Sequence, residues 1–194
     1  MNIEFFKWSF FILFVIWFCV RMPYKKKALL SKKKKRKDVF LETFLEFLNY
    51  ISMMFLPLFV VFSSSIDFAA MNLPYVIRCG AIILYALNLI LFIWCHKSLG
   101  DNWSSGLEIR EGHKLIQKGP YEKIRHPMYT HFWLLIISQG LILDNWIVLV
   151  YGLIAWGTLY FLRVGKEEEM MIEEFGDEYR EYIKRTRRLI SKLG

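Results

Sequence analysis

The chain has 194 residues, of which 55% are hydrophobic and 18% aromatic, and its 26 Lys and Arg against 18 Asp and Glu give a formal net charge of +8. A mean hydropathy of +0.30 is too high for a soluble domain of this size and excludes that class. Because 23% of the residues are nevertheless charged, the charges must be segregated from the apolar stretches. This combination indicates an all-α integral membrane protein.

Five apolar segments follow one another along the chain. They cover residues 3–20, 40–62, 73–94, 129–143 and 146–162. At about 1.5 Å per residue, the first three are each long enough to cross roughly 30 Å of hydrocarbon as a helix. The last two are shorter and only Asp144-Asn145 separates them, which predicts a tight helical hairpin whose arms barely span. We expect about five transmembrane helices in a single domain, 1–194.

The basic residues predict the orientation of these helices. Ten of the 26 lie in 21–37, six in 97–125 and eight in 163–192, which are alternate loops and the C-terminal tail. Basic residues accumulate on the cytoplasmic side, so the N-terminus is expected outside and the C-terminus in the cytoplasm. The membrane is the cell membrane in a prokaryote and the endoplasmic reticulum in a eukaryote.

Two features near the N-terminus have competing interpretations. A cleaved signal peptide is disfavoured, because Glu4 and Lys7 precede the apolar run and no small-x-small site follows it. The polybasic stretch 25–37 could contact nucleic acid. Between two membrane helices, however, it is expected to contact anionic lipid headgroups, and no nucleic-acid partner is expected.

The cytoplasmic half contains a long loop and a polar helix. In the loop, 96–128, short apolar stretches at 107–109 and 114–116 flank Gly112, which favours a short hairpin or a folded-back loop against the helices. From Lys166 onward, apolar residues recur mostly at three or four positions, which predicts an amphipathic helix interrupted near Gly176. The three cysteines show no Cys-x-x-Cys and no histidine at ligand spacing, so neither a disulfide nor a metal site is predicted.

A group of polar residues stands directly against the last two apolar segments. Arg125, His126 and Tyr129 precede or begin the first arm of the predicted hairpin, and Arg163 and Glu167 follow the second arm. The hairpin returns the chain to the leaflet where it began, so these side chains are expected to converge at one membrane boundary. Polar groups in this setting are costly and indicate a functional site.

Over residues 99–182 the motifs resemble the isoprenylcysteine carboxyl methyltransferases and the related phospholipid methyltransferases, in a compact prokaryotic or archaeal form. The matching pieces are Leu99-Gly100, Trp103-Ser104, His113 to Ile116, Gly119-Pro120-Tyr121, Arg125 to Tyr129, Arg163, Glu167-Glu168, Phe175-Gly176, Tyr179 and Tyr182. Their combination in this order carries the resemblance. The Arg-His-Pro sequence alone would not, because membrane sterol reductases also contain it.

The resemblance implies a cytoplasmic cofactor-binding loop and transfer of a methyl group from S-adenosylmethionine to the C-terminal carboxylate of a prenylated cysteine or a similar lipidic acceptor, on a protein or a small molecule. It implies Arg163 as the group that holds the acceptor carboxylate, and Arg163 with Glu167 as the catalytic residues. The implied cofactor-binding residues are His113, Lys114, Leu115, Ile116, Tyr121, His126, Pro127, Met128, Tyr129, Glu167 and Glu168. Aromatic residues with Met53, Met54 and Met128 could line the path of the lipid chain.

The implied chemistry suits a membrane boundary. A carboxylate is already a nucleophile at neutral pH, so attack on a sulfonium methyl needs alignment and partial desolvation but no general base. Opposite charges disappear on the way to ester and thioether, and a pocket of low polarity therefore does not hinder the reaction. No glycine-rich turn of the dinucleotide-binding type is present, which excludes the usual soluble methyltransferase fold.

Three alternatives remain. Methylation of the amine of phosphatidylethanolamine would need Glu168 or His126 as a base and would leave Arg163 repelling the substrate. A sterol or enone reductase that uses NADPH shares Arg125-His126-Pro127 but needs a larger basic pocket. A non-catalytic anchor would depend on Lys32 to Lys37 instead of Arg163 and Glu167. The sequence does not identify the natural acceptor, the lipid entrance or the oligomeric state.

Overall fold

The structure is a computed structural model that describes residues 3–30, 33–36, 39–104, 106, 108–110 and 112–190. Within these residues the α-helices are α1 (Ile3–Leu30), α2 (Val39–Tyr50), α3 (Leu56–Phe62), α4 (Tyr75–Leu99), α5 (Pro127–Ile142), α6 (Trp146–Phe175) and α7 (Asp177–Arg185). A π-helical turn, η1 (Ile51–Phe55), joins α2 to α3. The strands are β1 (Lys33–Arg36) and β2 (Glu108–Arg110), and short 3-10 turns cover Asp67–Ala69, Gly100–Asn102 and Gly119–Glu122.

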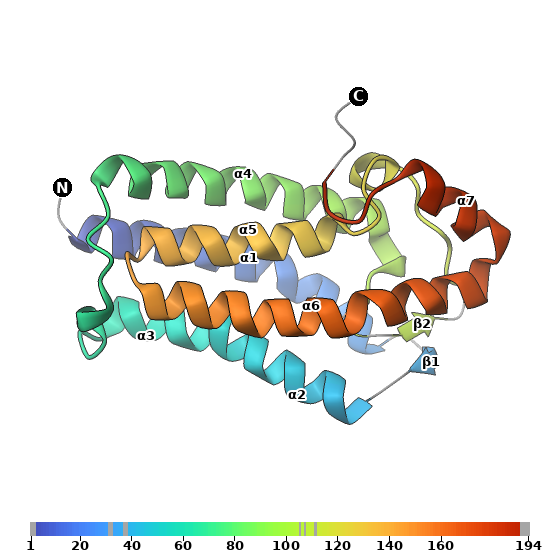
Figure 1. The fold of residues 1–194 in the computed structure, drawn as a ribbon, viewed down its shortest axis with the longest axis horizontal. Coiled ribbons are helices and arrows are strands. Elements are labelled where there is room, and N and C mark those ends of the chain that lie inside the picture. The colour runs from blue at the N-terminus through green and yellow to red at the C-terminus, as the bar shows by residue number, and fades with distance from the viewer. Residues whose placement is uncertain are drawn as a thin grey trace.

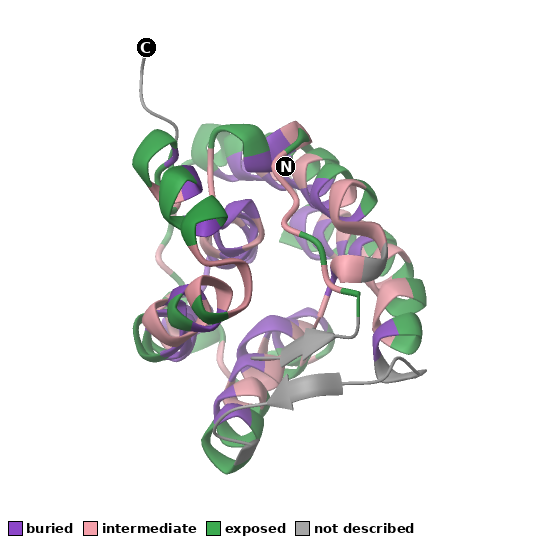
Figure 2. Cartoon of the chain, turned by 90° about the vertical axis from the view of Figure 1, so that its right-hand side faces the viewer, coloured by how far each residue is buried: buried purple, intermediate pink, exposed green. Residues whose placement is uncertain are grey.

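The long helices lie side by side along the longest dimension of the molecule (Figure 1). Helix α5 lies between α4 and α6 and packs against both, while α6 packs on α2 and α1 packs on α4. The N-terminus is at one end, and α7, β1 and β2 are at the other. Viewed from that second end, the buried faces of the helices point toward one another (Figure 2).

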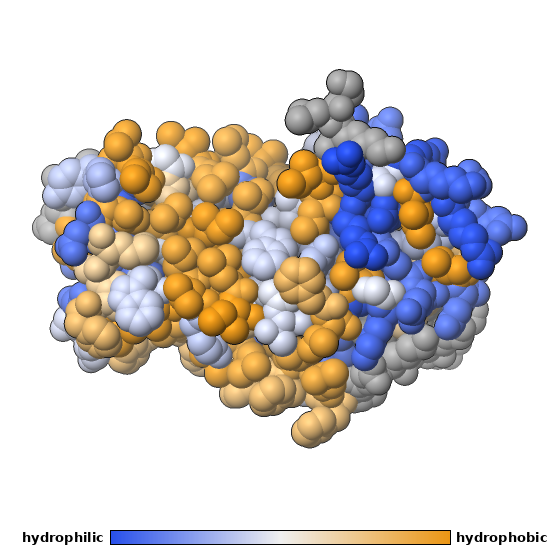
Figure 3. Space-filling model, in the orientation of Figure 1, coloured by the Kyte–Doolittle hydropathy of each residue, from blue (hydrophilic) through white to orange (hydrophobic). Residues whose placement is uncertain are grey.

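The surface separates into an apolar and a polar part along the same axis. Apolar residues cover most of the length of the helices, and hydrophilic residues gather at the end that carries α7 (Figure 3). Exposed large apolar side chains include Val76, Ile83, Ile90 and Phe161 on helices α4 and α6. A surface of this kind is stable against lipid and not against water.

Within the described residues, four helices are long and apolar enough to cross a membrane. They are Ile3–Ala28, Phe40–Phe62, Tyr75–Leu99 and Trp146–Phe175. This agrees with the first three predicted spans and with a multi-pass membrane protein. Helix α5 has 16 residues and therefore extends about 24 Å, less than the hydrocarbon core of a bilayer. That α5 forms a fifth span stays a prediction.

The second arm of the predicted hairpin is much longer than 146–162. Helix α6 continues without a break to Phe175, because Lys166 to Glu169 are good helix formers and no proline interrupts them. It ends at Gly176, whose positive φ of 57° favours glycine, and α7 begins immediately afterward. The predicted amphipathic helix with an interruption at Gly176 is therefore confirmed, with Tyr179 and Tyr182 on its buried side.

Of the two arrangements expected for the loop 96–128, a short hairpin or a folded-back loop, the hairpin is wrong. Strand β2 pairs antiparallel with β1 of the polybasic stretch, with Lys33 opposite Arg110 and Arg36 opposite Glu108. Residues 114–116 form no strand. Leu107 of the proposed hairpin, and Lys32 and Lys37 of the polybasic stretch, lie outside the described residues, and contact of this stretch with lipid stays a prediction.

The turn between α5 and α6 is held by specific polar contacts. Asn145 caps α6, its Oδ1 accepting hydrogen bonds from the backbone N–H groups of Ile147 and Val148, both at 3.1 Å. The buried Arg78 of α4 donates two hydrogen bonds, of 2.8 and 3.1 Å, to the carbonyl of Ile142 at the end of α5. Its Nη1 also lies 3.8 Å from Asp144 Oδ2. These contacts orient the predicted hairpin as it returns toward the polar end.

A buried hydrogen-bonded chain joins α1, α5 and α4. Trp17 Nε1 donates to His131 Nε2 at 3.1 Å, and His131 Nδ1 lies 3.1 Å from Asn88 Oδ1. Since Nε2 accepts from the indole, the proton of the neutral ring is on Nδ1 and is donated to Asn88. All three side chains are nearly fully buried, so this chain sets the orientation of the Trp17 ring inside the bundle.

Candidate active site

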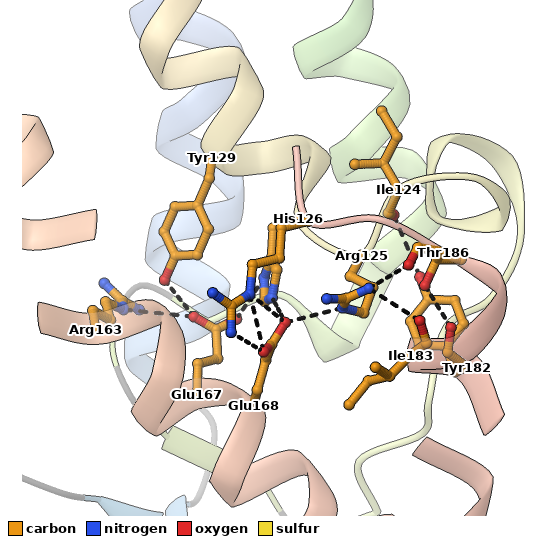
Figure 4. A network of polar contacts seen from close by, with 11 residues as sticks. Ile124, Arg125, His126, Tyr129, Arg163, Glu167, Glu168, Tyr182, Ile183 and Thr186 are labelled. Atoms are coloured by element: carbon orange, nitrogen blue, oxygen red, sulfur yellow. Dashed lines mark hydrogen bonds and ion pairs between the residues drawn. The ribbon is translucent and has the colours of Figure 1, made fainter. Parts of the chain in front are cut away.

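The site begins where the loop enters α5. Pro127 occupies the first turn of that helix, where its missing N–H costs no hydrogen bond. Arg125 and His126 stand immediately before it, and Tyr129 follows in its first turn. From α6, Arg163 and Glu167 project from one face because they are four residues apart. Figure 4 shows that Tyr129, Arg163 and Glu167 point toward one another with His126 beside them, as predicted from the return of the hairpin. Arg125 points instead toward Glu168 and Thr186.

Glu167 lies at the centre of this group. The hydroxyl of Tyr129 donates a hydrogen bond to Glu167 Oε2, and Arg163 Nε lies 3.7 Å from the same oxygen. His126 Nδ1 lies 3.7 Å from Oε1. The Glu167 side chain retains about a third of its exposure, so its carboxylate is held from several sides and still faces the cavity described below.

The other neighbour of Arg163 is a residue that the sequence interpretation missed. Glu42 of α2 is 4% exposed, and its Oε2 lies 3.6 Å from Arg163 Nη1. Arg163 is therefore placed between two carboxylates, one on its own helix and one across the bundle. The sequence did contain a signal for Glu42, a carboxylate inside the apolar segment 40–62. An ionisable residue in a membrane span is costly without a partner, so its presence indicates a buried ion pair or a functional site.

Glu168 points to a different set of partners. It accepts hydrogen bonds from Arg125 Nε at 2.9 Å and from Arg188 Nη2 at 2.6 Å, and His126 Nε2 lies 3.2 Å from its Oε1 (Figure 4). Glu168 and Pro127 are absent from the cavity wall, unlike the other residues predicted to bind cofactor. Pro127 begins a helix and Glu168 joins Arg125, His126 and Arg188, and their contact with the cofactor stays a prediction.

Backbone and hydroxyl hydrogen bonds hold residues 187–189 over the entrance to α5. The backbone N–H of Arg125 donates to the carbonyl of Arg187 at 2.8 Å, and that of His126 donates to the carbonyl of Arg188 at 3.0 Å. The hydroxyl of Thr130 donates to the carbonyl of Leu189 at 2.7 Å. Residues 187–189 therefore cover the polar side of the site.

Two tyrosines connect α7 to the loop. The hydroxyl of Tyr182 donates to the backbone carbonyl of Tyr121 at 2.5 Å. Burial raises the pKa of Tyr182 to about 12, and burial also raises the pKa of Tyr121 well above its ordinary value. Both hydroxyls are therefore protonated at neutral pH, and the Tyr182 bond holds α7 against the loop.

A cavity of about 200 Å³ runs through this region. It is far larger than the space that one buried water needs, about 10–15 Å³ on this kind of measure. Its polar end is lined by His113, Lys114, Leu115, Ile116, Tyr121, His126, Arg163, Glu167 and Tyr179. Its apolar end, among the membrane helices, is lined by Trp17, Met53, Met54, Met128, Phe132, Trp156 and Leu159. One continuous cavity thus connects charged groups at the membrane boundary with an apolar interior.

The cavity is also lined by residues to which the sequence interpretation gave no individual binding role, although Trp103 belonged to the matching motifs. Arg21 and Trp17 come from α1, Glu46, Asn49 and Tyr50 from α2, and Trp103 from the loop after α4. Arg21 had been interpreted only through the cytoplasmic charge rule, and no local pattern associates α1 with the loop. The pairing of α1 with α4 and α5 brings these groups together.

Comparison with known proteins agrees with this arrangement. Residues 81–173 match the sequence model of the isoprenylcysteine carboxyl methyltransferase family. Over this segment the chain is similar to members of that family. Relatives include protein-S-isoprenylcysteine O-methyltransferases from Schizosaccharomyces pombe, 31% identical over 38% of this chain and 31% of the relative, and from Dictyostelium discoideum, 33% identical over 40% and 32%. The chain thus spans about a third of the length of these curated relatives.

The fold is similar to that of a solved member of the isoprenylcysteine carboxyl methyltransferase family. The eukaryotic intramembrane Ras methyltransferase aligns over 78% of this chain and 52% of its own, with a TM-score of 0.53 and 21% identity. At 78% of the chain, the match extends beyond the segment 81–173.

Proposed function

We propose that this chain transfers a methyl group from S-adenosylmethionine to the carboxylate of a prenylated cysteine or a similar lipidic acceptor, forming a methyl ester. The observation that carries the proposal is the single cavity that joins a charged end, at Arg163 and Glu167, to an apolar end among the membrane helices. A polar cofactor and a lipidic acceptor can meet only in a site with both kinds of wall.

The polar end of the cavity fits S-adenosylmethionine. Its ammonium and sulfonium groups are cationic, and Glu167 presents a partly exposed carboxylate on the wall. The loop residues His113 to Ile116 supply backbone donors and acceptors, and Tyr121 and Tyr179 supply aromatic faces that attract cations. We assign cofactor binding to these residues together with His126, Met128 and Tyr129.

When bound, the cofactor supplies a methyl carbon whose bond to sulfur breaks, the electron pair staying on sulfur, as the acceptor oxygen bonds to that carbon. No proton is transferred in this exchange, and the residues of the chain have to supply alignment and desolvation only. Trp156, Phe132 and Leu159 exclude water from the apolar end. Tyr129 fixes the Glu167 carboxylate by its hydrogen bond, so that the negative charge stays on the cofactor side.

Arg163 stands at the junction of the two ends. Its planar guanidinium can accept a carboxylate in a two-pronged arrangement, and we propose that it contacts the acceptor. Because Glu42 and Glu167 already balance much of its charge, it can hold the acceptor without trapping the anion. The orientation proposed for the chain, with the N-terminus outside, puts this junction on the cytoplasmic side, where the cofactor is available.

The test is transfer of radiolabelled methyl from S-adenosylmethionine to N-acetyl-S-farnesylcysteine in liposomes, scored as base-labile ester. We expect the parent protein to form ester and Glu167→Gln and Arg163→Gln to lose at least about tenfold in kcat/KM, since each removes a charge at the reacting end. The matched controls are Glu169→Gln and Arg180→Gln, whose side chains are exposed on α6 and α7, and these should keep the parent rate. Cofactor binding without ester formation would redirect the acceptor to phosphatidylethanolamine, which is assayed in parallel. Absence of cofactor binding in the parent would overturn the proposal.

A further inference from the structure

Arg21 of α1 reaches into the apolar part of the cavity and is surrounded by aromatic rings. Its guanidinium carbon lies 5.4 Å from the ring centre of Trp17, 5.7 Å from that of Trp103 and 5.4 Å from that of Phe132. Each of these distances is within the range of a cation–π interaction. The three rings come from α1, the loop after α4 and α5, so the helix packing builds this group and no local sequence pattern does.

The guanidinium is incompletely satisfied. Its Nη1 is buried and has no hydrogen-bond partner among the residues that the structure describes. The guanidinium donates a hydrogen bond to the Tyr50 side chain, and Tyr50 and Glu46 attract its charge whereas Arg163 repels it. Within the described part of the chain, Nη1 is therefore the one buried atom of this side chain that lacks a partner. A buried N–H without a partner is costly, and a native structure keeps one where a ligand or a specific role compensates.

The chain satisfies a buried arginine fully where the role is structural. Arg78, near the opposite end of α4, donates two hydrogen bonds to the Ile142 carbonyl and lies 3.8 Å from Asp144. It also lies over the ring of Phe6 at 3.9 Å. Arg21 has the aromatic neighbours of such a site without the carbonyl acceptor. Among the described residues Arg21 Nη1 thus has no acceptor, and it is available to an acceptor atom of a bound ligand.

The aromatic wall beside Arg21 is rigid. Trp17 is held by its hydrogen bond to His131, which in turn contacts Asn88. The ring next to the guanidinium therefore cannot rotate without breaking a buried hydrogen-bonded chain. A fixed aromatic wall and an unused N–H donor of the guanidinium are preorganised to bind a planar anion such as a carboxylate.

We propose that Arg21 binds the carboxylate of the lipidic acceptor, as a second guanidinium acting with Arg163. This inference rests on the proposed function. Arg163 lies between Glu42 and Glu167, which reduce its attraction for a further anion, whereas the Arg21 environment is mainly aromatic. The cavity then sorts its ligands by charge: Glu167 faces the cationic cofactor, and Arg21 selects an acceptor with a free carboxylate and releases the uncharged ester.

The experiment compares equilibrium binding of N-acetyl-S-farnesylcysteine and of its methyl ester, each measured in the presence of S-adenosylhomocysteine. The two ligands share the lipid chain and differ only in the charge of the carboxyl group. The variants are Arg21→Gln and Arg21→Lys, with Lys26→Gln as the control because Lys26 is exposed on the same helix. Binding of S-adenosylhomocysteine and thermal unfolding are measured for every variant to establish that it is folded.

The parent and Lys26→Gln are expected to bind the acid about 10- to 100-fold more tightly than the ester, a range typical of a hydrogen bond to a charged group. Arg21→Gln should reduce this preference to about twofold or less while its affinity for the ester and for S-adenosylhomocysteine stays within about twofold of the parent. Arg21→Lys, which keeps the charge and loses the planar fork, should keep part of the preference.

Several results would overturn the inference. The first is equal binding of acid and ester by the parent, and the second is a preference for the acid that Arg21→Gln retains. The third is an equal loss of affinity for acid and ester in Arg21→Gln, which would indicate a packing role. Failure of the proposed function is a distinct result. If the parent transfers no methyl group but prefers the acid through Arg21, the Arg21 carboxylate site is supported and the proposed methyl transfer is refuted. If Arg21→Gln forms ester with an unchanged KM for the acceptor, the proposed methyl transfer is supported and the Arg21 site is refuted.

Discussion

Arg163 of α6 and Glu42 of α2 form a buried ion pair across the helix bundle, with Nη1 3.6 Å from Oε2. The pair connects the return arm of the hairpin with a helix from the N-terminal half, outside the segment 81–173 that matches the family. The position of the guanidinium in the cavity therefore depends on α2 as well as on the residues of the motif.

Replacing Glu42 tests this dependence. Glu42→Gln leaves a similar shape but removes the charge, and Arg163 keeps its contact with Glu167. We expect the free energy of unfolding to fall by about 1–3 kcal/mol and methyl transfer to fall at least about tenfold. A double-mutant cycle of Glu42→Gln, Arg163→Met and the double variant measures the coupling between the two residues. Thermal unfolding gives the coupling in stability, and transfer assays give the coupling in activity. Additive effects of the two single changes would show that the pair is not coupled.

The Tyr129 hydroxyl is predicted to position Glu167 for the cofactor. Tyr129→Phe removes the hydrogen bond to Glu167 Oε2 and keeps the ring between Trp156 and Tyr160. We expect affinity for S-adenosylmethionine to fall about 5- to 20-fold, because the carboxylate loses a donor that orients it. Calorimetric titration is the measurement, with Tyr151→Phe on α6 as the control. Its hydroxyl makes only a long bond of 3.5 Å to the Leu48 carbonyl. Equal losses in both variants would contradict this role.

Arg125 and Arg188 both bind Glu168 but should contribute unequally to stability. The Arg125 side chain is 9% exposed, whereas the Arg188 side chain is 47% exposed. Arg125 also donates to the carbonyl of Thr186. We expect Arg125→Met to cost about 2–4 kcal/mol and Arg188→Met about 1 kcal/mol or less, since solvent screens the exposed pair. Denaturant unfolding tests the order, and limited proteolysis of the C-terminal segment should be faster for Arg125→Met. A larger cost for Arg188→Met would refute it.

Two glycines of α6 should respond to alanine in opposite directions. A Cβ at Gly152 would lie 2.7 Å from Ile136 Cγ2 of α5, so Gly152→Ala must push the two helices apart and is expected to cost about 1–3 kcal/mol. A Cβ at Gly165 has nothing within 4 Å, and Gly165→Ala should stabilise the helix by up to about 1 kcal/mol. Thermal unfolding in one detergent compares them. Destabilisation by both changes would show that α6 needs glycine flexibility and not close approach.

Much of the site was predictable because it depends on local patterns. His126, Tyr129, Arg163 and Glu167 were expected together, since a short turn between two apolar runs forces the chain back to the same boundary. The orientation of Glu168 was not predictable from its position in the motif. One residue along a helix turns the side chain by about 100°, which takes Glu168 from the cavity wall to Arg125 and Arg188.

The sequence by itself determined the properties that repeat locally along the chain. Uninterrupted apolar stretches determine the helices at 3–28, 40–62 and 75–99, and Gly176 determines the end of α6. Both are local properties, because the hydrogen bonds of a helix and its burial in lipid depend on residues that are neighbours in the sequence. The tertiary structure decided which distant segments meet: β1 with β2, Glu42 with Arg163, and Arg21 with Trp103. These contacts depend on how the helices pack, and packing is a property of whole surfaces that no short stretch of sequence contains.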